Sequence, residues 1–335
     1  MDLPQLRRPI VVAPMAGGPT TPELVAAGCR VGGAGFLPAG YLTAAVLEQK
    51  ITALRDLLGP GEEAWGVNLF VPSPADRARD EAAVEAYRAR LGDGAGEPRW
   101  EDDDHYPDKL RLLTEVSPVP MVSFTFGCPT REVVDALHAV GSSVLVTVTE
   151  RHEATAAVAC GADALVVQGF DAGGHRGTHD AAAEPNSRDA LALLPELSYV
   201  ELPKIAAGGV ATAGDVRRLL EAGAVAVQVG TALLRCPEAG TSAAHRELLA
   251  RATGTRITRA FSGRPARGLV NRFLTEHDAE APSVYPQVDQ VTKPLRAAAA
   301  AAGDGEAISG WAGTGWAAGQ ELPAEQVLTQ LCEGL

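Results

Sequence analysis

Short apolar runs alternate with longer amphipathic segments along roughly the first two thirds of the chain. The runs are rich in Val, Ile, Leu and Ala and have the length of strands that are buried on both faces. They cover residues 9–15, 31–36, 65–70, 119–126, 143–148, 164–168, 203–207 and 224–229. Segments with helical periodicity separate several of them, at residues 22–27, 43–58, 75–90, 130–140, 151–160 and 212–222. Because strand and helix alternate, the pattern predicts crossover connections and a mainly parallel sheet.

Eight strand units of this kind are the number that a (β/α)8 TIM barrel requires, so we predict an α/β fold of that class. A doubly wound open sheet is the alternative. After residue 241 the alternation stops, and helices are expected at 291–302 and 323–332. We therefore predict a barrel domain formed by residues 1–235 plus 286–335. Residues 236–285 are expected to be an appended or inserted helical segment that covers the substrate pocket.

Composition narrows the class of protein. The chain has 335 residues, of which 46% are hydrophobic, so it can bury a large core. Its formal net charge of −13 argues against nucleic acid or an anionic membrane surface as a partner. No apolar run reaches the roughly 20 residues of a membrane span, and residues 1–8 lack the apolar core of a signal peptide. We expect a soluble cytoplasmic protein, for which a homodimer is one compatible assembly.

Two further features argue against a metal centre. The five cysteines are scattered without zinc-ligand spacing, as expected of reduced thiols. An acidic run at residues 101–104 lies in a polar stretch, residues 92–108. Its carboxylates are contiguous, and no helical spacing gathers them on one face. We interpret the stretch as a solvated connection that binds no metal.

Glycines follow the last two predicted strands. Gly208 and Gly209 end one strand, and Gln228–Thr231 ends the next. In TIM barrels, the loops after strands seven and eight, together with a helix N-terminus, commonly bind phosphate through main-chain N–H groups. The pair of loops therefore predicts a phosphorylated ligand, which the residues alone leave open as a phosphosugar, a nucleotide or FMN.

Amide side chains at other strand ends favour a flavin. Asn68 and Gln168 can both donate and accept hydrogen bonds, which suits the alternating N–H and C=O edge of an isoalloxazine. Taken singly, each amide is more often a core or loop hydrogen bond. Gln168 is followed by a loop with three glycines that carries Asp171 and His175. This loop predicts a site residue at 175, although a plain turn with a surface histidine fits the residue types about equally well.

Five segments resemble nitronate monooxygenases, formerly called 2-nitropropane dioxygenases. They are VVAPMAGG at 11–18, GVNLF at 66–70, VVQGFDAGGHRG at 166–177, AAGGV at 206–210 and QVGTALL at 228–234. The resemblance implies a (β/α)8 barrel with non-covalent FMN and makes His175 the active-site histidine. With the strand ends, it gives as expected cofactor contacts Ala13, Pro14, Met15, Asn68, Gln168, Gly173, Gly174, Gly208, Gly209, Gln228, Val229, Gly230 and Thr231.

The resemblance also implies the substrate contacts and the reaction. His175, Tyr285 and Lys293 are expected to contact substrate, although Lys293 equally fits a surface cation at a helix start. The implied activity is FMN-dependent oxidation of alkyl nitronates, such as propionate 3-nitronate, or of nitroalkanes. O2 is consumed, and a carbonyl compound and nitrite are formed. His175 would hold the anion or take the α-proton of a nitroalkane, with Asp171 as a group that orients it or simply as part of the loop.

Two alternatives remain open at this point. One is an FMN-dependent oxidoreductase similar to enoyl-ACP reductases, which would take its electrons from NAD(P)H. The chain has no separate dinucleotide-binding fingerprint, but flavoenzymes can bind nicotinamide without one. The other alternative is a non-catalytic flavin-binding protein. Fold alone does not decide between these three readings.

Overall fold

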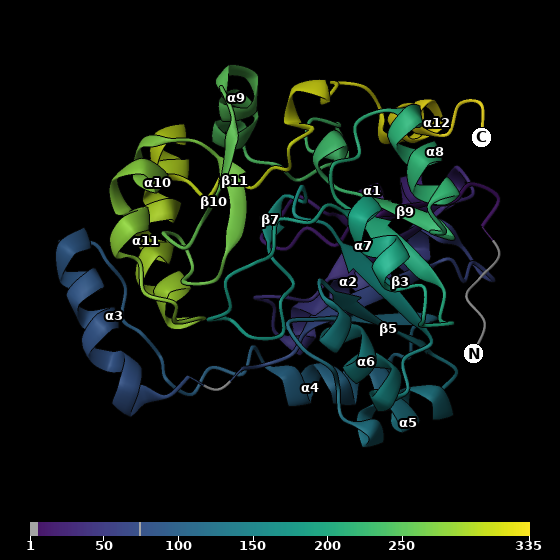
Figure 1. The fold of residues 1–335 in the computed structure, drawn as a ribbon, viewed down its shortest axis with the longest axis horizontal. Helices are drawn as coiled ribbons and strands as arrows, with labels where there is room; N and C mark the ends of the chain where they lie inside the picture. Colours follow the sequence, from purple (N-terminus) through teal and green to yellow (C-terminus); the bar gives the residue numbers. More distant parts are fainter. Residues whose placement is uncertain (1–5, 74) are drawn as a thin grey trace.

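Eight parallel strands close into a barrel in the computed structural model, which describes residues 6–73 and 75–335 (Figure 1). The strands are β1 (Ile10–Val12), β2 (Ala34–Pro38), β3 (Trp65–Phe70), β4 (Met121–Thr125), β5 (Ser143–Val148), β6 (Ala164–Gln168), β8 (Lys204–Ala207) and β9 (Ala226–Val229). β9 pairs with β1 in the register Ile10↔Val227, which closes the sheet. The predicted (β/α)8 barrel is confirmed, and the doubly wound alternative is wrong.

Helices follow most strands and cover the outside of the barrel. They are α1 (Pro22–Arg30), α2 (Ala44–Leu58), α5 (Arg131–Ala139), α6 (Arg151–Cys160), α7 (Ala190–Glu196) and α8 (Ala213–Glu221). Four of these helices begin after a threonine whose hydroxyl accepts a main-chain N–H three residues further on; these are Thr21, Thr43, Thr130 and Thr212. Such caps satisfy N–H groups that have no partner inside the helix, and so fix where each helix starts.

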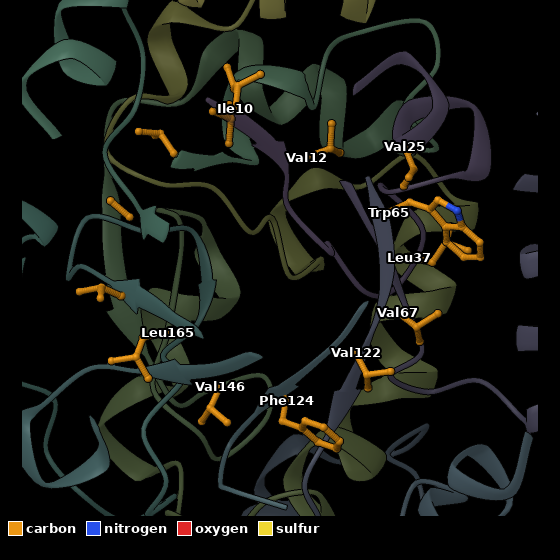
Figure 2. Close-up of a cluster of buried hydrophobic side chains, with 14 of the residues drawn as sticks. Ile10, Val12, Val25, Leu37, Trp65, Val67, Val122, Phe124, Val146 and Leu165 are labelled. Carbon is orange, nitrogen blue, oxygen red and sulfur yellow. The ribbon is translucent and has the colours of Figure 1, made fainter. Parts of the chain in front are cut away.

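The strand side chains form two apolar layers. Val12, Val67, Val122 and Val146 belong to the layer between strands and helices, and Figure 2 shows them pointing away from the ring of strands. A separate cluster fills the barrel itself; it includes Val11, Phe36, Met121, Leu145, Val166 and Ile205. Alternation along each strand produces the two layers. Because this cluster packs the interior, the polar side chains at the carboxyl ends of the strands lie above a filled core.

Irregular elements follow the barrel. They are α9 (Ala243–Arg251), β10 (Thr255–Thr258), β11 (Ala266–Leu269), α10 (Arg272–His277) and α11 (Gln287–Ala301), and α12 (Ala324–Leu331) ends the chain. β11 pairs antiparallel with β10 and with the two-residue strand β7 (Gly174–His175). The prediction that 236–285 is helical is therefore wrong in part. Thr255–Thr258 and Ala266–Leu269 are short and contain Arg, Thr or Gly, so they carry too little apolar periodicity to be recognised.

One excursion leaves the barrel between β3 and β4. Its helix α3 (Arg77–Leu91) lies beside α11 in Figure 1, and Val84 and Tyr87 pack on Val288 and Val291. A short helix, α4 (Tyr106–Arg111), then continues into a π-helical turn at Leu112–Val116. Packing of α3 on α11 ties the excursion to a helix that is distant in sequence.

The polar stretch 92–108, here called the acidic segment, joins α3 to α4. Asp104 binds the ammonium group of Lys109, with 2.8 Å between Oδ2 and Nζ, and the Lys109 side chain is 1% exposed. Asp102 accepts a hydrogen bond from Gln290 on α11 at 2.6 Å. The interpretation of this segment as a solvated connection is thus wrong for Asp102 and Asp104, which are partly buried and bind Gln290 and Lys109, whereas Glu101 and Asp103 are exposed. Residues 6–73 and 75–335 contain no group of three or more His, Cys, Asp or Glu side chains placed to hold a metal ion.

No helix in the described ranges combines the length and the apolar character that crossing a membrane requires.

Candidate active site

A cavity of about 590 Å³ opens at the carboxyl ends of the barrel strands. Ligand sites of (β/α)8 barrels occupy this end, and the volume lies in the range of small-molecule pockets. Every site residue expected from the sequence except Tyr285 lines it. These residues are Ala13, Pro14, Met15, Asn68, Gln168, Gly173, Gly174, His175, Gly208, Gly209, Gln228, Val229, Gly230, Thr231 and Lys293. The barrel thus brings together segments that are more than two hundred residues apart.

The glycines after β8 and β9 form one wall. Gly208 and Gly209 have φ of +109° and +72°, which side-chain-bearing residues rarely adopt. A Cβ on Gly208 would lie 2.8 Å from the nitrogen of Ala172, so the chain can pass here only without a side chain. Within the described residues, the main-chain N–H groups of Gly209 and Thr231 make no hydrogen bond to a protein acceptor. Two unpaired donors at adjacent loops form a local anion-binding arrangement.

Thr231 and Gly173 both contact the C-terminal part of the chain at Gly313. The Thr231 hydroxyl oxygen accepts the N–H of Gly313 at 2.8 Å, which leaves its own proton to donate. Gly173 passes so close to the same stretch that a Cβ would lie 2.4 Å from the Gly313 nitrogen. The residues 309–316 therefore close the cavity over the glycine loops.

The two predicted amides differ in what they bind. Asn68 is buried, and its Nδ2 donates to Ser123 Oγ at 2.9 Å and to Thr125 Oγ1 at 3.0 Å. Gln168 donates from Nε2 to the carbonyl of His175 at 3.0 Å and accepts the N–H of Gly177 at 2.8 Å. Gln168 thus folds the 169–177 loop back onto the strand that it leaves. This contact fixes where His175 is presented.

His175 lies on β7 opposite Ala266 of β11, and its imidazole lines the cavity. Its Nε2 lies 2.8 Å from Oγ of Ser262. Asp171, which the sequence offered as an orienting group, has a loop role instead, because its carbonyl accepts the N–H of Thr314 and its side chain lies against Gly209. The partner of His175 is therefore a serine 87 residues away in the chain.

Aromatic rings and cations surround this imidazole. Burial, reinforced by the positive charges of Arg264 and Arg296, lowers the pKa of His175 to about 3. The side chain is consequently neutral at pH 7. Three rings pack on it with centroids 5.4–5.8 Å away, from Phe126, Tyr285 and Trp311. Tyr285, which is not among the cavity-lining residues, contacts the site through this packing.

Helix α11 contributes a charged wall. Lys293 and Arg296 both line the cavity, and Arg296 Nη2 binds Asp289 Oδ1 at 2.7 Å. Lys293 is exposed at the rim. The hydroxyl of Tyr41 lies 3.4 Å from that of Tyr285, and burial raises the pKa of both phenols. The site therefore combines neutral aromatic and phenolic groups with two cations and one carboxylate.

Several lining residues were not predicted from the sequence. They are Tyr41, Phe70, Ser242, His245, Ser309, Trp311 and Gly313. The stretch SGWAGTGW at 309–316 has three glycines and two tryptophans in a chain with only four tryptophans, and that composition could have drawn attention to it. Tyr41 and Ser262 lack such a signal, because each belongs to a loop without a recognisable pattern.

Comparisons with known proteins show the family to which the chain belongs. The family model described as nitronate monooxygenase matches residues 3–334. A nitronate monooxygenase of Pseudomonas aeruginosa is 40% identical over 346 aligned residues, covering 98% of this chain and 97% of the relative. A probable nitronate monooxygenase of Bacillus subtilis is 33% identical and covers 98% and 96%.

Solved structures extend the comparison. A nitroalkane oxidase from Streptomyces ansochromogenes superposes with a TM-score of 0.92 at 45% identity, covering 97% of this chain and 95% of that one. FabK from Thermotoga maritima gives a TM-score of 0.74 at 25% identity, with coverage of 97% and 92%. Both similarities extend over nearly the whole chain, including the segments that follow the barrel.

Proposed function

The chain belongs to the nitronate monooxygenase family, a family of flavin-dependent oxidoreductases, and from this premise we propose that it is an FMN enzyme. It oxidises alkyl nitronates, or nitroalkanes, with O2 to a carbonyl compound and nitrite. Propionate 3-nitronate is one candidate substrate. The observation that carries the proposal is that His175 and the glycine loops after β8 and β9 line a single cavity. A cytoplasmic location and a homodimer stay predictions.

The residues present fit a flavin mononucleotide. The free N–H groups of Gly209 and Thr231 suit its phosphate, and Gly208, which has no side chain, adds no side-chain atom beside them. Residues 13–15 and Asn68 would contact the ring system from the β1 and β3 ends. When bound, the flavin supplies the electron acceptor that no side chain of this site provides. The other predicted cofactor contacts are proposed on the same ground, that they line the cavity.

The protein groups have three tasks in this proposal. Neutral His175 presents a ring nitrogen to the substrate, either to accept its α-proton or to donate to a nitro oxygen. The aromatic rings around it exclude water and so strengthen polar interactions inside the site. Lys293 and Arg296 supply positive potential that attracts an anionic nitronate.

We further propose that residues 236–285 act as the cover of the substrate pocket, on a barrel formed by 1–235 and 286–335. Two observations support this division. Ser242 and His245 from this segment line the cavity, and β11 pairs with the strand that carries His175. Tyr285, at the end of the segment, packs on His175 and is proposed to contact substrate together with Lys293.

The experiment that tests the function uses the purified protein reconstituted with FMN. A yellow protein with an oxidised flavin spectrum is expected, and a colourless protein that cannot take up FMN would refute the cofactor. Anaerobic stopped-flow mixing with propionate 3-nitronate, ethyl nitronate, NADH and NADPH in parallel then separates the activities. We expect the nitronates to reduce the flavin rapidly.

The similarity to FabK supports an NAD(P)H-dependent enoyl reductase as the second candidate. Rapid flavin reduction by NADH or NADPH, with no reaction of either nitronate, would favour it over the nitronate reaction. A flavin that neither kind of donor reduces would favour the non-catalytic alternative.

A further inference from the structure

Ser262 contacts one of the two ring nitrogens of His175. The Nε2 atom is 2.8 Å from Ser262 Oγ, and His175 is one of the residues that line the cavity. With Nε2 engaged by the protein, Nδ1 is the ring nitrogen left for a ligand. The tautomer then depends on whether the serine hydroxyl donates to Nε2 or accepts from it.

The serine is held rigidly. Its side chain is 1% exposed and lies in a tight turn in which the N–H of Gly263 bonds the carbonyl of Arg259 at 2.8 Å. Gly263 has φ of +80°, and a Cβ there would lie 2.4 Å from the carbonyl oxygen of Val284. Strand β11, which begins at Ala266, pairs directly with His175. His175 is therefore held by its pairing with β11, and Ser262 by the turn that leads into the same strand.

A second acceptor decides the direction of the hydrogen bond. Ser262 Oγ lies 3.3 Å from the carbonyl oxygen of Arg264, to which it can donate. Among the described residues, this hydroxyl is the only donor to that buried carbonyl. If the serine proton pointed to His175 instead, the carbonyl would lose its partner, which is costly in a buried position. Only the relay Nε2–H to Oγ–H to O=C satisfies all three groups.

We propose that Ser262 is a positioning residue that holds the Nε2–H tautomer of His175 and leaves Nδ1 as the base that takes the α-proton of a nitroalkane. In this step the α C–H bond breaks, its electron pair stays on the substrate as the nitronate, and the proton forms a bond to Nδ1. The resulting imidazolium keeps its Nε2–H bond to Ser262 and later returns the added proton to solvent. A preformed nitronate has no such proton to lose. The choice of a nitroalkane as the substrate rests on the proposed function. The assignment of the Nε2–H tautomer does not.

The kinetic test compares two substrates of the FMN-loaded enzyme. Ser262→Ala should lower kcat/KM for nitroethane by about tenfold or more, a part of the roughly 10²–10⁴-fold that a positioned base contributes, and change kcat/KM for ethyl nitronate by less than about threefold. Ser262→Thr keeps the hydroxyl and should restore nitroethane turnover. Ser142→Ala is the matched control, because Ser142 is equally buried and donates to a main-chain carbonyl, of Val119, outside the site. Equal losses on both substrates would overturn the proposal.

The structural test needs no turnover. Nitrogen-15 NMR of the histidine rings at neutral pH should give a protonated Nε2 and an unprotonated Nδ1 for His175, assigned by loss of its signals in His175→Gln. Ser262→Ala should shift this pattern, whereas Ser142→Ala should not. A protonated Nδ1 in the native protein would overturn the proposal even if nitronates are oxidised. If the enzyme oxidises neither substrate, the proposed function fails and the NMR result still decides the tautomer.

Discussion

The main-chain N–H of Tyr41 donates to Oδ1 of Asp104 over 2.8 Å. This contact joins a residue of the cavity wall to the acidic segment. The other carboxylate oxygen of Asp104 binds Nζ of Lys109, also at 2.8 Å. Tyr41 has φ of +67°, so an otherwise unfavourable backbone conformation is held by this ion pair. The acidic segment thus shapes the pocket without supplying a lining residue.

We expect Asp104→Asn to destabilise the protein by about 3 kcal/mol, because it leaves the buried ammonium of Lys109 without its counter-ion. The asparagine oxygen still accepts the N–H of Tyr41, so the pocket wall keeps its shape. Adding Lys109→Met should recover most of the loss. Urea unfolding measures both effects, and Asp108→Asn, in an exposed ion pair, is the control. If Asp104→Asn alone were as stable as the native protein, the ion pair between Asp104 and Lys109 would contribute little to the free energy of unfolding.

The glycine wall makes a prediction about cofactor affinity. Gly208→Ala should weaken FMN binding by at least about tenfold, or 1.4 kcal/mol, since the new Cβ would lie 2.8 Å from the Ala172 nitrogen beside the proposed phosphate site. Gly223→Ala is a close match, because Gly223 has φ of +102° but nothing within 4 Å of its Cβ. Both variants carry about 1–3 kcal/mol of backbone strain. Quenching of flavin fluorescence gives the FMN dissociation constants of both variants. Equal values would show that Gly208 is not part of the proposed phosphate site.

Sequence patterns predicted what is local and missed what depends on distant pairing. The eight strands, the glycines after β8 and β9 and the loop at His175 carry signals within a few residues, and their gathering follows from barrel closure. Ser262 reaches His175 only because a two-residue strand, β7, pairs with β11, and neither strand has a periodic pattern. The acidic segment was misjudged for a related reason. Contiguous carboxylates suggest solvent, and nothing in the sequence shows that Lys109 and Gln290 meet them.

His245 predicts a pH dependence of stability. Burial lowers its pKa to about 4, with a smaller contribution from the Arg246 charge. Below about pH 6.5 the unfolded chain binds a proton there that the folded chain does not, so stability is lost as the pH falls toward 4. His175 acts in the same direction. Urea unfolding at pH 7 and pH 5 should show a loss of at most about 1.4 kcal/mol per pH unit for each histidine.

Single substitutions show how much His245 contributes to this pH dependence of stability. His245→Gln should make the loss between pH 7 and pH 5 smaller, because one of the two buried imidazoles is gone. His152→Gln should leave it unchanged, since that side chain is 75% exposed. The same pH dependence in all three proteins would mean that other groups cause it.

His175 itself predicts an unusual pH profile. Its pKa is held at about 3, so the neutral base persists as the pH falls from 8 to 5, and kcat/KM for a neutral nitroalkane should not decline through protonation of this residue. An enzyme whose catalytic histidine had an ordinary pKa would lose half its activity near pH 6.5.

His175→Ala should keep the bound flavin and lose about 10²–10⁴-fold in nitroalkane turnover. The smaller loss expected with a preformed nitronate distinguishes a base from a group that only binds the anion. Initial rates of nitrite release over this pH range measure the effects on turnover, and the visible absorption spectrum measures the bound flavin. A native profile with a midpoint near 6.5 would contradict the neutral buried base.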